Sequence, residues 1–322
     1  MKKLLMIAAF LGTLTAPAMA QETRTHIDAL DRMVEIPVTP QRIVSMHDHA
    51  LTLPLVELGA PVVGSHGRVR EDGSTYLRSV NTLMNVDFDN SEIEFIGAWN
   101  SIDFEKIASL KPDLIIARAP WDEEQIEKLE AIAPTAYVDD TADALELYQS
   151  IADVAGKLEE FNYLNAKYEH LITDAKGWLG NPSYTYSKIQ AWDGKLTVYA
   201  NYGALTRALD DLGFQIAGTG AELRNKGVGW GEEVSAELLP EQDADFLFDT
   251  YRIDQGQNDG PEVAWGRMET VLPNFCTLLS ACQKGNYIFI PREHAAANSF
   301  ATLTMNVHYV VSHVAGGHHP KQ

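Results

Sequence analysis

One long amphipathic segment near the middle of the chain constrains the fold more than any other feature. Between Leu158 and Gly180, apolar residues recur every three or four positions, which is the periodicity of an α-helix. At 1.5 Å of rise per residue, such a helix would be roughly 33 Å long. Because similar patterns lie on both sides of it, we interpret the segment as a connector between two lobes. A plain amphipathic helix within one large domain is the alternative.

A pattern that precedes one strand in the first half of the chain returns 132 residues later. In both copies a capping residue begins a short helix, a proline interrupts the end of that helix, and an acid precedes a buried strand. In the first copy, Asp103, Glu105 and Asp113 precede strand 114–116. In the second copy, the equivalent residues Ser235, Glu237 and Asp245 precede strand 246–248. Arg118 follows the first strand and Arg252 follows the second. Two related lobes would direct these arginines into a shared crevice.

Short apolar runs alternate with helical patterns on both sides of the connector. The expected strands cover residues 42–45, 62–64, 114–117 and 135–138 in the first half, and 189–192, 196–199, 246–248 and 287–290 in the second. This alternation predicts an α/β protein with a mostly parallel sheet flanked by helices in each lobe. Ligands of such sheets bind outside the carboxyl ends of the strands. His47, His49 and Arg118 fall at such ends, and a long polar stretch, 65–92, begins at another.

The N-terminus has the pattern of a secretory signal peptide. Lys2 and Lys3 precede an apolar run, and a small-x-small cleavage site ends at Ala20. The run is too short to span a membrane. Because no cysteine lies near the cleavage site, we do not expect a lipid anchor there. We therefore expect a signal peptide at 1–20, an N-terminal α/β lobe at 21–157, a connecting helix at 158–180 and a C-terminal α/β lobe at 181–322, in a soluble protein exported to the periplasm.

The acidic balance of the chain limits its partners. Without residues 1–20 it has 23 Lys and Arg against 45 Asp and Glu, a net charge of −22. This charge repels nucleic acids and anionic membrane surfaces. An anionic small molecule would therefore need a locally basic pocket.

The two cysteines, Cys276 and Cys282, lie in one short segment. Export favours a disulfide between them. Within a continuous helix they would be roughly 9 Å apart along the axis, so the segment must bend if the bond forms. Two free buried cysteines are the alternative.

Several short motifs occur in an order that extends over nearly the whole mature chain. They include Pro40-Gln41-Arg42-Ile43-Val44-Ser45, Leu58-Gly59-Ala60-Pro61-Val62-Val63-Gly64, Lys111-Pro112-Asp113-Leu114, Leu212-Gly213-Phe214 and Val234-Ser235-Ala236-Glu237. In this order and spacing the chain resembles the periplasmic substrate-binding proteins of ABC importers for iron siderophores, haem and cobalamin. The resemblance implies two α/β lobes joined by one long rigid helix.

The resemblance also implies ligand-binding positions. Arg118 and Arg252 match arginines that follow equivalent strands in catecholate binders, Trp230 matches a ligand-contacting Trp or His, and His294 falls near a metal-contacting tyrosine. The other ligand candidates are Tyr199, Tyr202, Tyr251 and Arg68, with Trp121, Arg70 and Arg207 as secondary ones. Arginine supplies a charged fork of donors, and aromatic side chains cover flat rings. Glu123 or Glu124 in one lobe, and Glu237 in the other, match acidic residues that contact the permease.

These features predict a monomeric binding protein without a cofactor. It would capture an anionic ferric siderophore, for example a catecholate, and deliver it to an inner-membrane ABC permease and its ATPase. Haem or cobalamin binding on the same fold is one alternative. Binding of Zn or Mn through His47 and His49, with His66 nearby, is another, and the tail carries His318 and His319. An enzyme is not expected, because no G-x-S-x-G, P-loop, H-E-x-x-H or G-x-G-x-x-G motif occurs.

Overall fold

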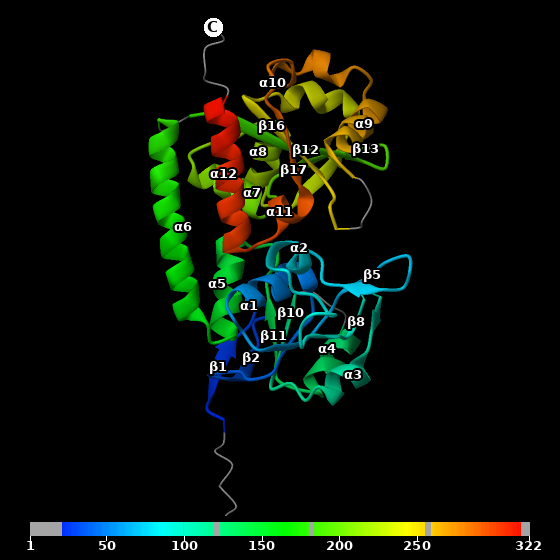
Figure 1. Ribbon diagram of the computed structural model, residues 1–322, viewed down its shortest axis with the longest axis vertical. Coiled ribbons are helices and arrows are strands. Elements are labelled where there is room, and N and C mark those ends of the chain that lie inside the picture. Colours follow the sequence, from blue (N-terminus) through cyan, green and yellow to red (C-terminus); the bar gives the residue numbers. More distant parts are fainter. Residues whose placement is uncertain (1–20, 99, 119–122, 181–182, 255–258, 317–322) are drawn as a thin grey trace, which may run out of the picture.

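Two lobes stacked along the long axis make up the molecule (Figure 1). The computed structural model describes residues 21–98, 100–118, 123–180, 183–254 and 259–316. The predicted signal peptide, Trp121, His318 and His319 lie outside these residues, as does the side chain of Glu123. No helix in the described ranges has both the length and the apolar character that a membrane crossing requires.

The N lobe is built around a five-stranded parallel sheet in the order β11-β10-β3-β4-β7. Its strands are β3 (Ile43–Ser45), β4 (Val62–Ser65), β7 (Glu94–Phe95), β10 (Leu114–Arg118) and β11 (Thr135–Val138). The sequence predicted four of these strands to within a residue or two, because buried parallel strands are short continuous apolar runs. The two-residue strand β7 carries no such run.

Helices and three small hairpins surround this sheet. The helices are α1 (Leu53–Glu57), α2 (Val80–Met84), α3 (Phe104–Ser109), α4 (Glu123–Glu130) and α5 (Ala144–Val154), with a π-helical turn η1 (Asp48–Thr52) before α1. The hairpins pair β1 (Thr23–Ile27) with β2 (Met33–Pro37), β5 (Arg68–Val69) with β6 (Thr75–Tyr76), and β8 (Gly97–Ala98) with β9 (Ser101–Ile102). The polar stretch 65–92 is thus an ordered hairpin and helix rather than an open loop.

The C lobe contains a mixed six-stranded sheet in the order β15-β13-β12-β16-β17, with β14 beside β12. Its strands are β12 (Thr185–Trp192), β13 (Lys195–Tyr199), β14 (Gln215–Ile216), β15 (Gly231–Val234), β16 (Phe246–Tyr251) and β17 (Tyr287–Pro291). The pairs β12–β13 and β13–β15 are antiparallel. Asp193 and Gly194 both have positive φ, 49° and 72°, and a two-residue turn of this kind forces an antiparallel hairpin.

Helices cover the C-lobe sheet. They are α7 (Ala204–Asp211), α8 (Gly218–Asn225), α9 (Pro261–Val271), α10 (Ser280–Gln283), α11 (Arg292–Ala296) and α12 (Phe300–Gly316), with the 3₁₀ turns η2 (Ala236–Gln242) and η3 (Phe275–Leu278).

The predicted connector is helix α6 (Leu158–Leu179), which runs along one side of the molecule beside α12 and reaches α5 (Figure 1). It ends at Gly180, whose φ of 72° is the left-handed conformation that closes many helices. Its buried face includes Phe161, Tyr168 and Ile172. Trp178, at the end of the predicted apolar pattern, is instead 59% exposed.

The two lobes share hydrophobic packing instead of meeting at a simple hinge. Tyr148 of the N lobe packs with Phe300 at the start of α12, with ring centroids 4.9 Å apart. In the opposite direction, Ala297 belongs to the cluster of N-lobe core residues. The segment between α11 and α12 therefore packs into both lobes at once.

The 132-residue repeat corresponds to a repeated structural role. Asp113, just before β10, accepts hydrogen bonds from the backbone N–H groups of Gln41 and Arg42 ahead of the neighbouring strand β3. Asp245, just before β16, accepts one from the backbone of Thr185 at the start of the neighbouring strand β12. Each acid thus joins the starts of two adjacent parallel strands, which explains why both lobes place an acid there.

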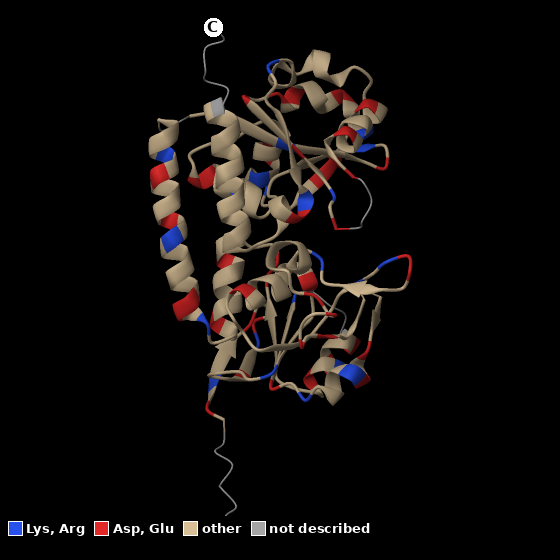
Figure 2. Cartoon of the chain, in the orientation of Figure 1, with Lys and Arg blue, Asp and Glu red and all other residues tan. Residues whose placement is uncertain are grey.

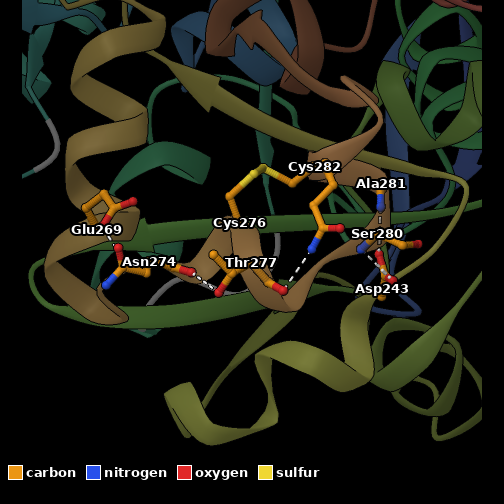
Figure 3. The surroundings of a disulfide bond; sticks show 9 residues. Asp243, Glu269, Asn274, Cys276, Thr277, Ser280, Ala281 and Cys282 are labelled. Carbon is orange, nitrogen blue, oxygen red and sulfur yellow. Dashed lines mark hydrogen bonds between the residues drawn. A yellow bond between two sulfur atoms is a disulfide. The ribbon is translucent and has the colours of Figure 1, made fainter.

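The disulfide between Cys276 and Cys282 is formed, with Cα atoms 5.3 Å apart (Figure 3). The bend that the sequence required is the extended residue Leu279 between η3 and α10. Asp243 caps α10 by accepting hydrogen bonds from the backbone N–H groups of Ser280 and Ala281 (Figure 3). The disulfide is therefore a local staple at one edge of the C lobe.

Replacing both cysteines by serine is expected to lower the free energy of unfolding by about 2 kcal/mol, because a short closed loop restricts the unfolded chain modestly. Urea unfolding under oxidising conditions measures the change. Ligand affinity should stay within a factor of about 2, because neither cysteine contacts the cleft described below. A loss above about 5 kcal/mol, or a collapse of affinity, would contradict a purely local role.

Candidate ligand-binding cleft

Two adjoining hollows form a cleft that both lobes line. The inter-lobe hollow, about 320 Å³, is lined by His47, His49, Ala50, Arg78, Arg118, Asp140, Thr141 and Leu147 of the N lobe and by Gly229, Trp230, Arg292, Ala296 and Asn298 of the C lobe. The C-lobe hollow, about 280 Å³, is lined by Gln190, Trp192, Asp193, Lys195, Thr197, Tyr199, Tyr202, Trp230, Glu233, Arg252 and Arg292. Trp230 and Arg292 line both hollows, so they stand at the junction.

The two arginines predicted from the repeat reach this cleft from opposite lobes. Arg118 ends β10 and forms an ion pair of 2.5 Å with Asp140. Arg252 directly follows β16, and its guanidinium lies over the ring of Trp192 at 4.4 Å. Burial lowers the pKa of Arg252, and the nearby charge of Arg292 lowers it further. Arg252 remains charged at neutral pH, because its ordinary pKa is so high.

An aromatic wall closes the C-lobe side of the cleft. Tyr202 and Trp230 are stacked, with centroids 4.9 Å apart, and Tyr199 contacts both rings edge-on. The carbonyl of Trp230 accepts hydrogen bonds from the backbone N–H groups of Ala200 and Asn201. These bonds hold the glycine-flanked Trp230 in position while 45% of its side chain stays exposed.

A buried lysine lies behind this wall. The ammonium of Lys188 lies 4.7 Å from the ring centroid of Tyr199 and 4.4 Å from that of Tyr202. Burial lowers the pKa of Lys188 to about 8, although Asp249, at 3.7 Å, opposes the shift. The positive charge behind the phenol rings makes this wall favourable for an electron-rich or anionic ligand surface.

The histidines that follow β3 are engaged in local structure. The Nδ1 atom of His47 accepts a hydrogen bond from the backbone N–H of Ala50, and Nδ1 of His49 lies 2.8 Å from the hydroxyl of Ser79. Burial holds the pKa of both imidazoles well below the usual 6.5, with Arg78 contributing in each case. Both rings are therefore neutral at physiological pH.

A buried carboxylate, Asp48, lies between these histidines. Burial alone would raise its pKa, but His66, whose Nδ1 lies 3.7 Å from Oδ1 of Asp48, and the charges of Arg78 and Arg68 hold it well below the usual value. Nε of Arg68 donates to Asp48 at 3.0 Å. Within the described ranges, no group of three or more His, Cys, Asp or Glu side chains is arranged to hold a metal ion.

The structure brings together five of the eight ligand-binding residues proposed from the sequence. Arg118, Arg252, Trp230, Tyr199 and Tyr202 all line the cleft.

The other three lie outside the lining of both hollows. Arg68 points to the buried Asp48. His294 stacks on Tyr309 and interacts with its hydroxyl at 2.9 Å, so α12 holds the ring. Tyr251 is the last residue of β16, where alternation along the strand separates its side chain from that of Arg252.

The secondary candidates also have other partners. Arg70 lies over the ring of Tyr76, and Arg207 forms ion pairs with Asp143 and Asp211.

Sequence reasoning missed two arginines of the cleft, Arg78 and Arg292. Arg292 directly follows β17, so the rule that ligands bind at the carboxyl ends of strands would have identified it. Arg78 lies between the short strand β6 and helix α2. No pattern in the polar stretch distinguishes it from Arg68 and Arg70.

Acidic positions are distributed over both lobes, and basic positions occur on segments where the lobes face each other (Figure 2). Glu124 of α4 forms an ion pair with Lys128, and its side chain is 77% exposed. Glu237, in the first turn of η2, is exposed on the other lobe. Both positions are accessible to a partner.

Comparison with known proteins gives consistent matches. The model of the family described as periplasmic binding protein matches residues 74–263. The probable siderophore-binding lipoprotein YfiY of Bacillus subtilis (strain 168) is 30% identical over 249 residues, which are 74% of this chain and 73% of that protein. The petrobactin-binding protein YclQ of the same organism is 28% identical over 211 residues, which are 63% of this chain and 62% of that protein.

The fold is similar to that of Staphylococcus aureus SirA, whose crystal structure is complexed with staphyloferrin B. The TM-score is 0.72 at 20% identity, over 92% of this chain and 98% of that chain. The chain belongs to the periplasmic binding protein family. The family and the two-lobe α/β fold expected from the sequence are thus confirmed, and the family consists of extracytoplasmic binding proteins rather than enzymes.

Proposed function

We propose that this member of the periplasmic binding protein family captures an anionic ferric siderophore in the cleft and delivers it to an inner-membrane ABC permease. One observation carries the proposal. Four arginines, Arg78, Arg118, Arg252 and Arg292, line the cleft of a chain whose net charge is −20. Such a local excess of positive charge attracts and orients an anionic ligand. The names of YfiY and YclQ, and the ligand of SirA, support the same class of ligand.

The residues have distinct roles in this proposal. Arg118 and Arg252 neutralise the chelate from opposite lobes, and Trp230 with Tyr199 and Tyr202 covers one of its faces. A catecholate would present flat rings to this wall, where stacking and the charge of Lys188 favour binding. Shared packing between the lobes, at Tyr148 and Phe300, favours a nearly preformed cleft.

Delivery involves one acidic residue on each lobe, Glu123 or Glu124 and Glu237. Rim charges of this kind steer and orient a partner more than they add affinity. Charge reversal at Glu124 and Glu237 should slow siderophore uptake without changing ligand affinity. Unchanged uptake in cells would remove both residues from the permease contact.

Export would release the protein in soluble form after cleavage at Ala20, whereas YfiY is named as a lipoprotein. Mass spectrometry of the protein from the periplasmic fraction tests this point. A mature chain that begins at Gln21 is expected, and a lipid-modified or uncleaved chain would contradict it.

A ligand panel tests the function itself. Quenching of tryptophan fluorescence should report binding, because Trp230 borders both hollows. The panel contains a ferric catecholate, a ferric hydroxamate, ferric citrate, haem, cobalamin and Zn²⁺. Submicromolar binding of at least one anionic ferric chelate is expected. Binding of haem, cobalamin or Zn²⁺ alone would refute the proposal.

Arg118→Ala and Arg252→Ala should each lower the affinity for the anionic ferric chelate by about 10-fold, because each removes charge-assisted hydrogen bonds to the ligand. The double variant should lose about 100-fold if the two contacts act independently. Lys128→Ala is the matched control, because this cation is exposed on α4 outside the hollows. Unchanged affinity in both single variants would exclude these arginines from the site.

A further inference from the structure

Three arginines line the inter-lobe hollow. Arg118 forms an ion pair with Asp140, and the other two approach the hollow from opposite lobes. Arg78 lies in the turn ahead of α2, and Arg292 is the first residue of α11. Arg292 is among the charges that lower the pKa of Arg78. The two guanidinium groups therefore act on each other across the boundary between the lobes.

The charge of Arg78 is only partly compensated. Its side chain is 13% exposed, and its NH2 atom lies 3.9 Å from Oδ1 of Asp48. That carboxylate is held more closely by Arg68, at 3.0 Å. Nε of Arg78 is buried without a hydrogen-bond partner, which is unfavourable for a donor. Burial lowers the pKa of Arg78 to about 10, so it is still charged at neutral pH.

Among the residues that the structure describes, Arg292 also has no carboxylate dedicated to it. Of its two acidic neighbours, Glu293 accepts a hydrogen bond from the backbone N–H of Ile253, and Asp254 accepts one from the hydroxyl of Tyr76. Burial acts to lower the pKa of Arg292, but Tyr202 and Glu293 raise it above the ordinary value. Arg292 therefore brings a firmly held positive charge to the junction of the two hollows.

We propose that Arg78 and Arg292 form a clamp across the two lobes that binds a carboxylate group of the ligand. The inference rests on the function proposed above and narrows the ligand class to ferric chelates that carry carboxylates. An oxyanion between the two guanidinium groups would satisfy the free donor of Arg78. It would also relieve the repulsion between two like charges.

The side chains that line the hollow favour a carboxylate over the other common iron ligands. A carboxylate offers two coplanar oxygens, which match the planar fork of a guanidinium. Catecholate rings present flat faces, yet two of the three aromatic side chains of the wall, Tyr199 and Tyr202, line only the C-lobe hollow, and Trp230 alone borders both hollows. On the N-lobe side of the inter-lobe hollow, the described lining contains no Phe, Tyr or Trp. A neutral hydroxamate would leave both arginines without a counter-charge.

The test compares ferric citrate, ferric enterobactin and ferrioxamine B, a hydroxamate complex, by fluorescence and calorimetric titration of the full mature chain. The wild type should bind ferric citrate most tightly. Arg78→Ala and Arg292→Ala should each lower the affinity for ferric citrate by about 30-fold or more. Arg78→Lys and Arg292→Lys keep the charge but lose the fork, and should recover only part of the affinity. Arg70→Ala, in the neighbouring hairpin, is the matched control and should change affinity less than 3-fold.

Folding of the variants is checked by thermal unfolding without ligand. Arg78→Ala removes a buried charge and should not lower the melting temperature. If the melting temperature of Arg78→Ala does fall, Arg78→Gln takes its place in the titrations. Tighter binding of enterobactin or ferrioxamine B by the wild type would overturn the clamp. The clamp would also be overturned if both alanine variants lost less than 3-fold in affinity for ferric citrate, or if the lysine variants recovered the full affinity. If none of the three complexes binds the wild type, the proposed function itself fails.

Discussion

Glu57→Ala is expected to lower the free energy of unfolding by about 3–5 kcal/mol, because it leaves several buried donors without an acceptor. Glu57 lies at the end of α1 in the N lobe, and its carboxylate accepts hydrogen bonds from the backbone N–H groups of Phe300 at 2.8 Å and Ala301 at 2.7 Å. The hydroxyl of Tyr148 donates to the same carboxylate. An N-lobe side chain thus caps the first turn of α12 in the C lobe.

Urea unfolding at pH 7 measures this change. Glu57→Gln keeps one acceptor oxygen and should lose about half as much stability. Glu169→Ala is the matched control, because Glu169 is exposed on α6, and its change should stay within about 0.5 kcal/mol. A loss below about 1 kcal/mol for Glu57→Ala would mean that the lobes are held together by apolar packing alone.

The pH dependence of Glu57 has a defined sign. Burial raises its pKa above the ordinary 4.5, so the folded state binds the proton more tightly than the unfolded state does. The contribution of Glu57 is therefore most favourable at low pH and weakens as the pH rises through the folded-state pKa. The stability difference between the wild type and Glu57→Gln should shrink with rising pH. A difference that grows would contradict the raised pKa.

Lowering the pH from 7.5 to 5.5 is expected to remove about 2–3 kcal/mol of stability through His47 and His49 together. Burial holds the pKa of both imidazoles well below 6.5 in the folded state. Below that pH the unfolded chain binds protons that the folded chain does not. Each histidine then contributes a loss of up to about 1.4 kcal/mol per pH unit.

The double variant His47→Asn/His49→Gln isolates this effect. Asn keeps a side-chain acceptor for the backbone N–H of Ala50, so the cap at η1 is retained. The stability of the double variant should fall less than that of the wild type between pH 7.5 and 5.5. Carboxyls with raised pKa, such as Glu293, are present in both proteins and cancel in the comparison.

His170→Gln, at a side chain that is 78% exposed, should leave the pH profile unchanged. If the double variant kept the full wild-type loss, the two cleft histidines would not be the groups that take up protons.

Local sequence patterns were sufficient for most of the fold. The apolar periodicity from Leu158 to Gly180 predicted α6, which ends at Leu179 with Gly180 as its C-cap. Short apolar runs predicted the main strands of both sheets. The acids Asp113 and Asp245 revealed two related lobes, because each begins the same contact between adjacent strands. Information of this kind depends on neighbours in the chain, since capping, periodicity and strand propensity act over a few residues.

The site was predicted only in part. Strand ends identified Arg118 and Arg252 as cleft residues. Nothing in the sequence indicates that Arg68 pairs with Asp48. Likewise, His294 was proposed from a resemblance, whereas contact with Tyr309 on α12 determines its position.

The sequence by itself therefore determined the family, the two lobes and the helix that connects them. Only the tertiary structure decided which side chains face the cleft, that Arg78 and Arg292 line the same hollow, and that Glu57 caps a helix of the other lobe. The physical reason is the distance along the chain. Residues more than 200 positions apart come together only through the stacking of two complete lobes, and no local pattern encodes that arrangement.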